Sequence, residues 1–360
     1  MRSLLIMRPD GRTRYGGDTT LVYDTAKALR ASGLECDVVE TDRPDPRGYD
    51  IAHIFNVGQP DVGERQMEAC EGSNAAIVLS PVWLDLKELF GRAVAAENVL
   101  VRERDERKAE AKLSQIRNAS LESFFNRRQQ KEFDEREGRQ SALLRRARAL
   151  LPNSSFEARD CMVRLGVRNV PFITVPIPTD LSPSECWQEE RWGVTCVGRV
   201  ETRKNQSALS FALRKESVEL DFVGALYNPG LAKECERWNA RSRFHGRVSR
   251  EDMLAIMGRS EVHALVSWCE TAGIASLEAA AAGAKLVVGD RGAEVEYFGD
   301  DVEYADPADP DSILDAVRRA LRRPRRSKGD SLDQRIRRLT WQHAASETMR
   351  AYELALAQPN

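Results

Sequence analysis

Residues 267–290 read SWCETAGIASLEAAAAGAKLVVGD, and this stretch decides the fold of the second half of the chain. The apolar run VHALVS leads into it and AKLVVGD ends it. This pattern predicts two strands joined by a loop and a short helix that begins near Thr271. Two glutamates, Glu270 and Glu278, stand eight positions apart in the connection. We expect Glu270 at the mouth of the helix and Glu278 about two turns along it.

The residues around these carboxylates are small. Ala272 and Gly273 remove side chains from the helix start, which lets a ligand approach the backbone N–H groups. An acidic residue there accepts hydrogen bonds from sugar or ribose hydroxyls. The alternative makes Glu270 a partner of the helix dipole and Glu278 a surface residue. Because Glu278 lies in the otherwise apolar IASLEAAAAGAKLVV, where a carboxylate needs a partner, the pattern favours the functional interpretation.

Strand-like runs alternate with helical segments in both halves of the chain. The first half has SLLIM, CDVVE, IAHIFNV and AAIVLSP, and the second has VTCVGRV, LDFVG, RFHGRVS, VHALVS, AKLVVGD and VEYADP. This alternation predicts an α/β protein with two doubly wound parallel sheets. The predicted domains are residues 1–180 and 181–340, with a linker near 181–193. The charged, helix-favouring residues 91–140 are predicted to be an insertion in the first domain.

Composition excludes several classes of protein. A chain of 360 residues is long enough for two domains, and its net charge of −2 gives no reason to expect a nucleic-acid partner. No apolar run is long enough to span a bilayer, and the N-terminal one is too short for a signal peptide. Seven scattered cysteines without a CxxC pair argue against a zinc site or a disulfide framework. They favour a cytoplasmic protein, in a reducing compartment.

Two cations follow the strand VTCVGRV. Arg199 and Lys204 flank the turn ETRKNQSAL, and Asn205 is placed to cap the helix after it. Cations beside a helix N-terminus suit a phosphate or diphosphate, although a solvated turn has the same composition.

Several stretches of the sequence together resemble a known family. CVGRVETRKNQSAL, followed by LVSWCETAGIASLEAAAAGAKLVVGDRGAEVEYF, resembles the retaining glycosyltransferases of family 4, the glycosyl transferases group 1. GGDTTLVYDTAKALRASGLECDVV and TWQHAASETMRAYELAL extend the resemblance over most of the chain except 91–140. It implies the GT-B architecture, two Rossmann-like domains facing a cleft, with the final helix of residues 341–360 returning to the first domain.

The resemblance also implies roles for single residues. Arg199 and Lys204 would stabilise the departing diphosphate of a UDP- or GDP-sugar, Glu278 would bind the ribose, and Glu270 would face the donor sugar. No cofactor or metal is expected, because the cations and the helix N-terminus supply the charge. The implied donor-binding residues are Gly16, Gly17, Gly198, Arg199, Lys204, Glu270, Gly273, Ile274 and Glu278.

The first half departs from the family pattern. Many members carry a histidine after the fourth strand, where this chain offers Ser80 and Trp83 as possible sugar or acceptor contacts. His53 fits a buried core histidine as well as a functional one. The acceptor would be a glycan, a lipid-linked molecule or a small molecule. The run SFFNRRQQ, with Phe124 and Phe125, suits either an anionic membrane surface or a packed helical hairpin.

The expected function is therefore a retaining, metal-independent sugar transferase of cell-envelope or polysaccharide biosynthesis. A GT-B nucleotide-sugar epimerase is one alternative, but its Ser-Gly-Gly stretch followed by paired acidic residues is absent from the sequence. A non-catalytic nucleotide-sugar-binding protein is another, and both glutamates together with Arg199 and Lys204 argue against it. No GxGxxG follows a strand, which disfavours a dinucleotide oxidoreductase.

Overall fold

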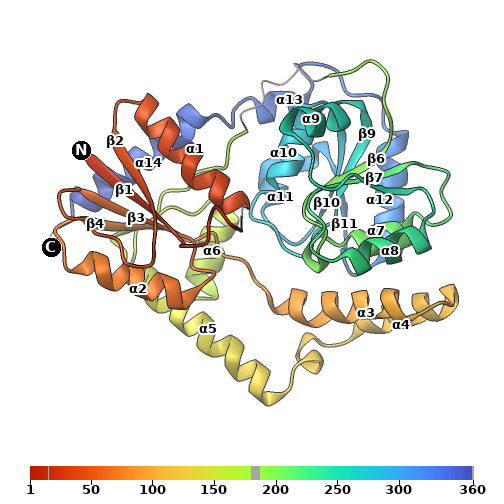
Figure 1. Cartoon of the computed structure of the whole chain (residues 1–360), viewed down its shortest axis with the longest axis horizontal. Coiled ribbons are helices and arrows are strands. Elements are labelled where there is room, and N and C mark those ends of the chain that lie inside the picture. The colour runs from red at the N-terminus through yellow and green to blue at the C-terminus, as the bar shows by residue number, and fades with distance from the viewer. Residues whose placement is uncertain (15, 180–186, 359–360) are drawn as a thin grey trace. The chain divides into compact units, whose positions relative to one another are not determined.

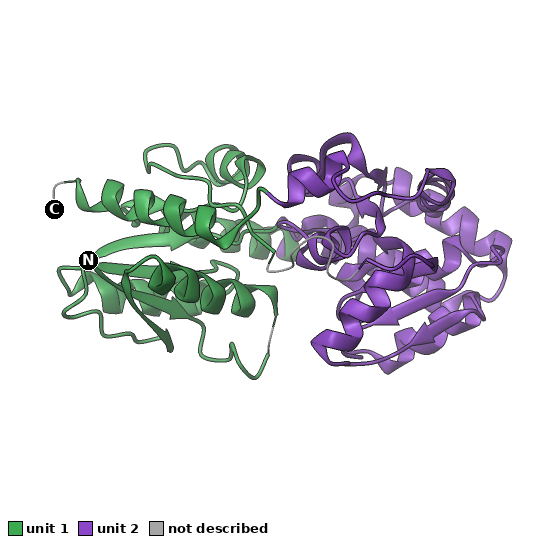
Figure 2. Ribbon diagram, turned by 90° about the horizontal axis from the view of Figure 1, so that it is seen from above, with its two compact units in different colours: residues 1–84, 129–180, 338–360 green, residues 85–128, 181–337 purple. Residues whose placement is uncertain are grey.

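The computed structural model describes residues 1–14, 16–179 and 187–358. The chain folds into two compact units (Figure 2). Unit 1 contains residues 1–84, 129–180 and 338–360, and unit 2 contains residues 85–128 and 181–337. The predicted domain boundary at 180/181 and Cys186 lie outside the described residues. The other six cysteines are buried free thiols.

Unit 1 is built on a parallel sheet with the strand order β2-β1-β3-β4-β5 (Figure 1). Its strands are β1 (Arg2–Met7), β2 (Glu35–Glu40), β3 (Ile51–Phe55), β4 (Ala76–Ser80) and β5 (Ala149–Leu150). Most of their residues are apolar and buried on both faces, as the continuous apolar runs predict.

Helices cover both faces of this sheet. On one face α2 (Pro60–Glu71), α5 (Arg127–Arg145) and α6 (Ser155–Val163) enclose a core around Met67, Leu144 and Cys161. On the other face lie α1 (Gly17–Ala31) and α14 (Trp341–Leu356), so the end of the chain packs on unit 1 (Figure 1).

Unit 2 has a six-stranded parallel sheet in the order β11-β10-β9-β6-β7-β8. Its strands are β6 (Trp192–Val197), β7 (Leu220–Val223), β8 (Ser242–Phe244), β9 (Ser260–Leu265), β10 (Lys285–Gly289) and β11 (Glu303–Ala305). All six were predicted from the apolar runs, and the prediction of two parallel α/β sheets is confirmed. The carboxyl ends of β10, β9 and β6 are neighbours, which positions the site described below.

The helices of unit 2 also form two layers. They are α7 (Gln206–Ala212), α8 (Pro229–Trp238) and α12 (Pro310–Arg322) on one face, and α9 (Arg250–Arg259), α10 (Ile274–Ala281) and α13 (Ser331–Ile336) on the other. The short segments are η3 (Thr202–Lys204), α11 (Glu294–Phe298) and η4 (Gly299–Asp301). The chain crosses from unit 2 to unit 1 in the short connection between α13 and α14.

Residues 85–128, which we call the arm, pack with unit 2 rather than with the first domain, to which the sequence analysis assigned them. The arm contains η1 (Leu89–Ala93), α3 (Val94–Arg102), α4 (Glu106–Asn118) and η2 (Leu121–Phe124). It contributes buried side chains to the core of unit 2: Ala93, Ala96, Leu100, Ala109 and Leu113. Phe124 and Phe125 are half-buried and pack around Gly91, so the aromatic pair lies against η1.

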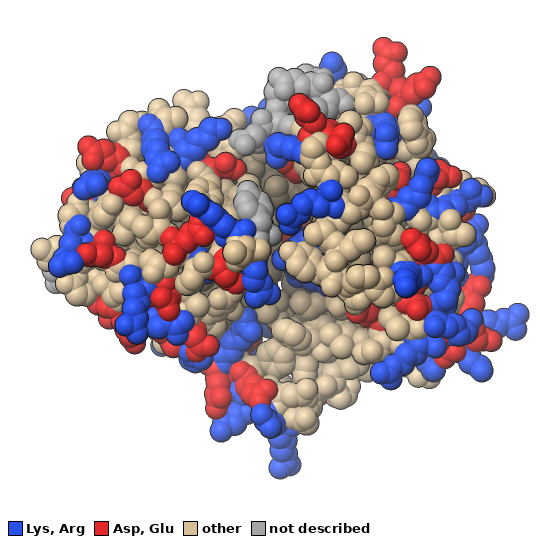
Figure 3. Space-filling model, in the orientation of Figure 1, with Lys and Arg blue, Asp and Glu red and all other residues tan. Residues whose placement is uncertain are grey.

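Charged side chains of both signs are interspersed over the face shown in Figure 3. Several arginines of the basic run 318–328 are held by acidic partners, such as Glu216 for Arg318 and Glu303 for Arg319 and Arg323. In the part of the chain that the structure describes, no helix combines the length and apolarity needed to cross a membrane.

Candidate functional site

The turn after β6 carries the predicted cations. Gly198 follows the strand, and its N–H donates to the Val223 carbonyl of β7 at 2.8 Å. Lys204 ends η3, and Asn205 takes a left-handed conformation (φ +58°) at the N-cap of α7. The side chain of Asn205 does not cap the helix as predicted. It donates to the Pro307 carbonyl at 2.9 Å and so ties the turn to the loop after β11.

The loop after β9 places the first glutamate. Helix α10 begins at Ile274, three residues later than predicted, because Gly273 is the N-cap. Gly273 has φ +60°, a conformation that side chains with a Cβ rarely adopt, and its carbonyl accepts from the Ser276 and Leu277 amides. The Trp268 amide donates to the Arg203 carbonyl at 2.9 Å, which joins this loop to the turn after β6.

The two loops bring together an alternating chain of charges. Lys204 Nζ donates to Glu270 Oε1, and Arg203 Nη1 lies 4.0 Å from Glu270 Oε2. Glu201 accepts from both Arg203 and Arg199, with Nη2–Oε1 distances of 3.2 Å in each pair. Three cations and two carboxylates leave a formal excess of one positive charge, which favours an anionic ligand.

Glu270 is ionised in this setting. Its side chain is 8% exposed, and burial alone would raise its pKa. The charges of Lys204 and Arg203 outweigh burial, so the pKa of Glu270 is lowered. Burial likewise disfavours the charged form of Arg203, but Glu270 and Glu201 raise its pKa above the ordinary value. The site therefore holds fixed charges.

Arg203 was not predicted to be a site residue. It adjoins Lys204 in ETRKNQ, but only Arg199 and Lys204 were singled out there. In the structure Arg203 contacts Glu270, whereas the guanidinium of Arg199 lies beside Glu201 and over the Tyr227 ring, 5.6 Å from its centroid.

Glu278 lies one helical turn inside α10 and is 8% exposed. Its Oε1 accepts from Arg250 Nη1 at 2.8 Å, and Arg250 is the first residue of α9. The surface interpretation of Glu278 is thereby excluded, and the expected partner of its buried carboxylate is a guanidinium from the neighbouring helix.

Glu294, the first residue of α11, is a third buried carboxyl group near this site and is 3% exposed. Among the described residues its Oε2 has no hydrogen-bond partner. A Cβ on Gly292 would clash with this oxygen and with the Glu270 carbonyl oxygen, so Glu294 lies beside the Glu270 backbone. Burial, followed by the charge of Glu270, raises the pKa of Glu294 to about 8. Its position in GAEVEYF gave no sign of burial.

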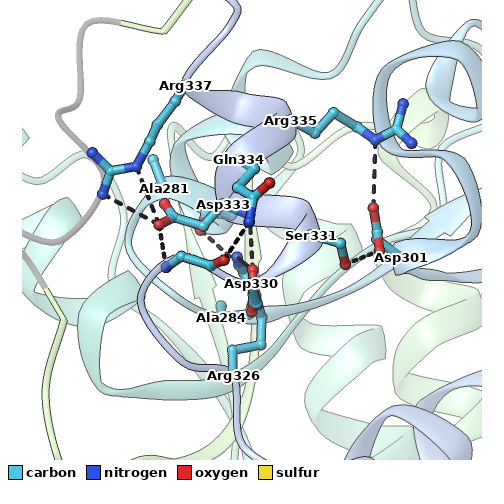
Figure 4. A network of polar contacts seen from close by, with 12 residues as sticks. Ala281, Ala284, Asp301, Arg326, Asp330, Ser331, Asp333, Gln334, Arg335 and Arg337 are labelled. Carbon is cyan, nitrogen blue, oxygen red and sulfur yellow. Dashed lines mark hydrogen bonds and ion pairs between the residues drawn. The ribbon is translucent and has the colours of Figure 1, made fainter.

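The C-terminal end of α10 is capped by side chains from distant segments. Arg326 donates to the carbonyls of Ala280 and Ala284, at 2.7 and 3.1 Å, and pairs with Asp330 (Figure 4). Trp187 Nε1 donates to the Ala281 carbonyl, and Arg191 donates to the Ala282 carbonyl. These bonds satisfy the carbonyls that a helix end leaves open.

The remaining predicted residues lie in unit 1. Gly16 is the extended N-cap of α1, and Gly17 is the first residue of that helix. Asp18, next in the chain, accepts from Arg8 Nε at 2.8 Å and from Asn56 Nδ2 at 3.2 Å. The two glycines therefore lie at the carboxyl end of the sheet of unit 1.

His53 is a buried core residue. Its ring nitrogens bond to Tyr352 Oη of α14 at 2.8 Å and to Ser80 Oγ at 2.9 Å, and burial lowers its pKa to about 3. This favours the core interpretation of His53 and engages Ser80 as well. Trp83 is 5% exposed, and its Nε1 donates to Gln140, so its ring belongs to the core.

Metal-ligating side chains are dispersed. Across the described residues, His, Cys, Asp and Glu form no group of three or more that could hold a metal ion.

The chain is similar to known proteins in sequence and in structure. The chain is 33% identical over 117 residues to MMP alpha-(1->4)-mannosyltransferase of Mycolicibacterium hassiacum, a match that covers 31% of this chain and 28% of that relative. Sucrose-phosphate synthase of Thermosynechococcus elongatus has a similar structure, with a TM-score of 0.71 and 16% identity over 99% of this chain and 100% of that one.

A second similar structure is the trehalose-6-phosphate protein of E. coli bound with UDP-2-fluoro glucose. Its TM-score is 0.65, with 11% identity and full coverage of both chains. These two likenesses show that the fold is the two-unit parallel α/β fold of GT-B proteins. Residues 179–338, which include the loops after β6, β9 and β10, match the family model of glycosyl transferases group 1. This similarity to the glycosyl transferases group 1 covers the segment that carries the candidate site.

Proposed function

We propose that this protein transfers a sugar from a nucleoside-diphosphate donor, a UDP- or GDP-sugar, to a glycan, lipid-linked or small-molecule acceptor. The observation that carries the proposal is the chain of charges at the carboxyl ends of β6 and β9. Lys204 and Arg203 are fixed by Glu270 beside the N-terminus of α10. A departing diphosphate gains negative charge as the glycosidic bond breaks, and preorganised cations stabilise that charge.

The two glutamates would then divide the donor between them. Glu278 lies deeper in α10 and would accept hydrogen bonds from the ribose hydroxyls. Glu270, before the helix, would face the sugar, where its lowered pKa keeps a negative charge near the positive character that develops on the ring. The amides of Gly273 and Ile274 lie at the open end of the helix and would help to hold the donor.

We infer that the transfer retains the anomeric configuration and needs no divalent ion. Retention rests on the family resemblance. Metal independence is supported by the cations, which supply the charge that a metal would otherwise provide. Turnover in the presence of EDTA checks the second inference, and restoration of lost activity by manganese would contradict it.

The first experiment is a calorimetric and thermal-shift screen of UDP-, GDP- and ADP-sugars, followed by kinetics of Lys204→Ala with the donor that binds. We expect kcat to fall about 10²-fold, because the lost charge acts mainly in the transition state. Lys233→Ala on the exposed side of α8 is the matched control and should leave kcat unchanged. Near-normal kcat in Lys204→Ala would place the reaction elsewhere.

The acceptor would be bound by unit 1, with Gly16 and Gly17 near both substrates. The M. hassiacum relative is a mannosyltransferase, which supports a hexose as the transferred group. We further propose a cytoplasmic location, with peripheral membrane contact through the segment 91–140 if the acceptor is lipid-linked. Sedimentation with anionic vesicles tests that contact, and equal recovery with neutral vesicles would argue against it.

A further inference from the structure

The ion pair between Arg250 and Glu278 joins two helices at the inner carboxylate of the site. Arg250 begins α9, where the Ser249 side chain caps the helix by accepting from the Asp252 amide at 3.0 Å. This cap fixes the backbone from which the Arg250 side chain reaches Glu278 Oε1, 2.8 Å from its Nη1. Within the described part of the chain, Glu278 is the only side chain to which Arg250 bonds.

The two members of this pair differ in exposure. The Glu278 side chain is 10% exposed, whereas that of Arg250 is 54% exposed. An ion pair with one half-exposed member contributes little to folding stability. It does fix the direction of the carboxylate. The pair is therefore better suited to presenting the carboxylate than to holding the fold.

We propose that Arg250 is a positioning residue of the nucleotide site, which holds Glu278 in the orientation that receives the ribose hydroxyls of a nucleoside diphosphate. This inference rests on the proposed function, because it requires Glu278 to bind the ribose. A carboxylate has about four lone-pair positions, so it can keep one bond to a guanidinium while it accepts bonds from hydroxyls. The guanidinium itself offers five N–H donors.

The alternative is that Arg250 blocks Glu278 from a nucleotide, and it predicts the opposite effect on nucleotide affinity when Arg250 is removed. If Arg250 blocked Glu278, a nucleotide would have to displace it, and its removal would tighten binding. In the arrangement that we propose, removal of Arg250 weakens the binding of ribonucleotides, because Glu278 is no longer held in the orientation that receives the ribose hydroxyls. A 2′-deoxynucleotide, which lacks one of the two hydroxyls, is then less affected by the same substitution.

The experiment is calorimetric titration of UDP, GDP and their 2′-deoxy forms into the whole protein. The variants are Arg250→Ala, Arg250→Lys and Glu278→Gln. Arg318→Ala, which removes a surface ion pair with Glu216 in the same unit, is the control. We expect Arg250→Ala to raise the Kd of the bound ribonucleotide about tenfold and that of its 2′-deoxy form less than about threefold. Arg250→Lys should recover part of the loss, and Arg318→Ala should lose nothing.

Kinetics with the full donor provide a second readout. Because the ribose contact is made in both the ground and the transition state, Arg250→Ala should raise KM and leave kcat within about twofold. Tighter nucleotide binding by Arg250→Ala, or an equal loss of affinity for the ribo and deoxy forms, would overturn the role of Arg250 but leave the proposed nucleotide site standing. A wild-type protein that binds neither UDP nor GDP, or a Glu278→Gln variant that keeps the preference for ribose, would overturn the proposed nucleotide site as well.

Discussion

At the scale of single residues, the site depends on carboxyl groups that are kept in different protonation states by their neighbours. Glu270 faces two cations, and its pKa is lowered although the side chain is buried. Glu294 is buried beside the Glu270 backbone without such a partner, and its pKa is raised to about 8. Near neutral pH one carboxyl is therefore charged and the other carries a proton.

This difference predicts how stability depends on pH. An unfolded Glu294 loses its proton near pH 4.5, whereas the folded one keeps it until about pH 8. Between these values the folded state binds one more proton, so this residue makes the protein less stable as pH rises. Glu294→Gln removes the titration with little change in shape. The stability of the variant relative to the wild type should rise from pH 5 to pH 9, by on the order of 4 kcal/mol.

Urea unfolding of both proteins at pH 5, 7 and 9 measures this difference. The groups that influence the Glu294 charge are Glu270, Lys204 and Asp290, with Tyr304 of β11 donating to the Glu294 carbonyl oxygen. Glu296→Gln on the exposed side of α11 is the control. A stability difference that stays constant with pH would mean that Glu294 is already ionised at pH 5.

The sequence was informative about residues that belong to a recognisable pattern. Lys204 and Glu270 were predicted from their positions after two strands, and the structure joins them directly. Arg203 and Glu294 were missed. Arg203 contacts Glu270, and Glu294 is buried beside the Glu270 backbone, only because the loops after β6, β9 and β10 meet in the fold. His53 shows the reverse case, since its two readings could be separated only by its bonds to Ser80 and Tyr352.

At the scale of elements, α10 connects the site to the opposite end of the sheet of unit 2. Its N-terminus lies between Glu270 and Glu278, and its C-terminal carbonyls are capped by Trp187, Arg191 and Arg326. The sequence predicted the helix and its flanking strands from their apolar periodicity. It could not predict the caps, because their donors lie about 40 or more residues away along the chain.

Arg326 should be the most sensitive member of the basic run. Its side chain is 8% exposed, pairs with Asp330 and donates to two carbonyls of the α10 end. Arg326→Ala leaves these acceptors buried and should lower the free energy of unfolding by about 2–3 kcal/mol. Arg322→Ala, at an exposed position of the same run, should change it by less than about 0.5 kcal/mol. Equal, small losses in chemical denaturation would show that the cap does not stabilise the helix.

At the scale of the whole molecule, the order of segments along the sequence does not reveal which unit each segment joins. The arm leaves unit 1 after β4, packs with unit 2 and returns at α5. Its helical character was predicted from composition, and an apolar stripe on a helix indicates burial without naming the partner. The partner becomes clear only from contacts, such as the Glu88–Arg291 ion pair at 2.8 Å beside the site.

The arm should therefore stabilise unit 2, and Leu100 is the residue that tests this. Its side chain is 1% exposed in the core of unit 2, and its carbonyl accepts from Arg237 and Trp238 of α8, at 2.6 and 2.9 Å. Leu100→Ala leaves a cavity between α3 and its neighbours and should cost about 2–4 kcal/mol. Hydrogen exchange should then increase in residues 85–128 and in α7 and α8, while peptides from unit 1 keep their protection.

Val94→Ala is the matched control, since Val94 lies in the same helix with 39% of its surface exposed and should change stability by less than about 0.5 kcal/mol. The two-unit division makes the location of the effect decisive. If Leu100→Ala increases exchange in β4 and α2 as much as in α8, the arm acts as part of unit 1. If exchange rises only in unit 2, a segment that interrupts the sequence of unit 1 is an integral part of the core of unit 2.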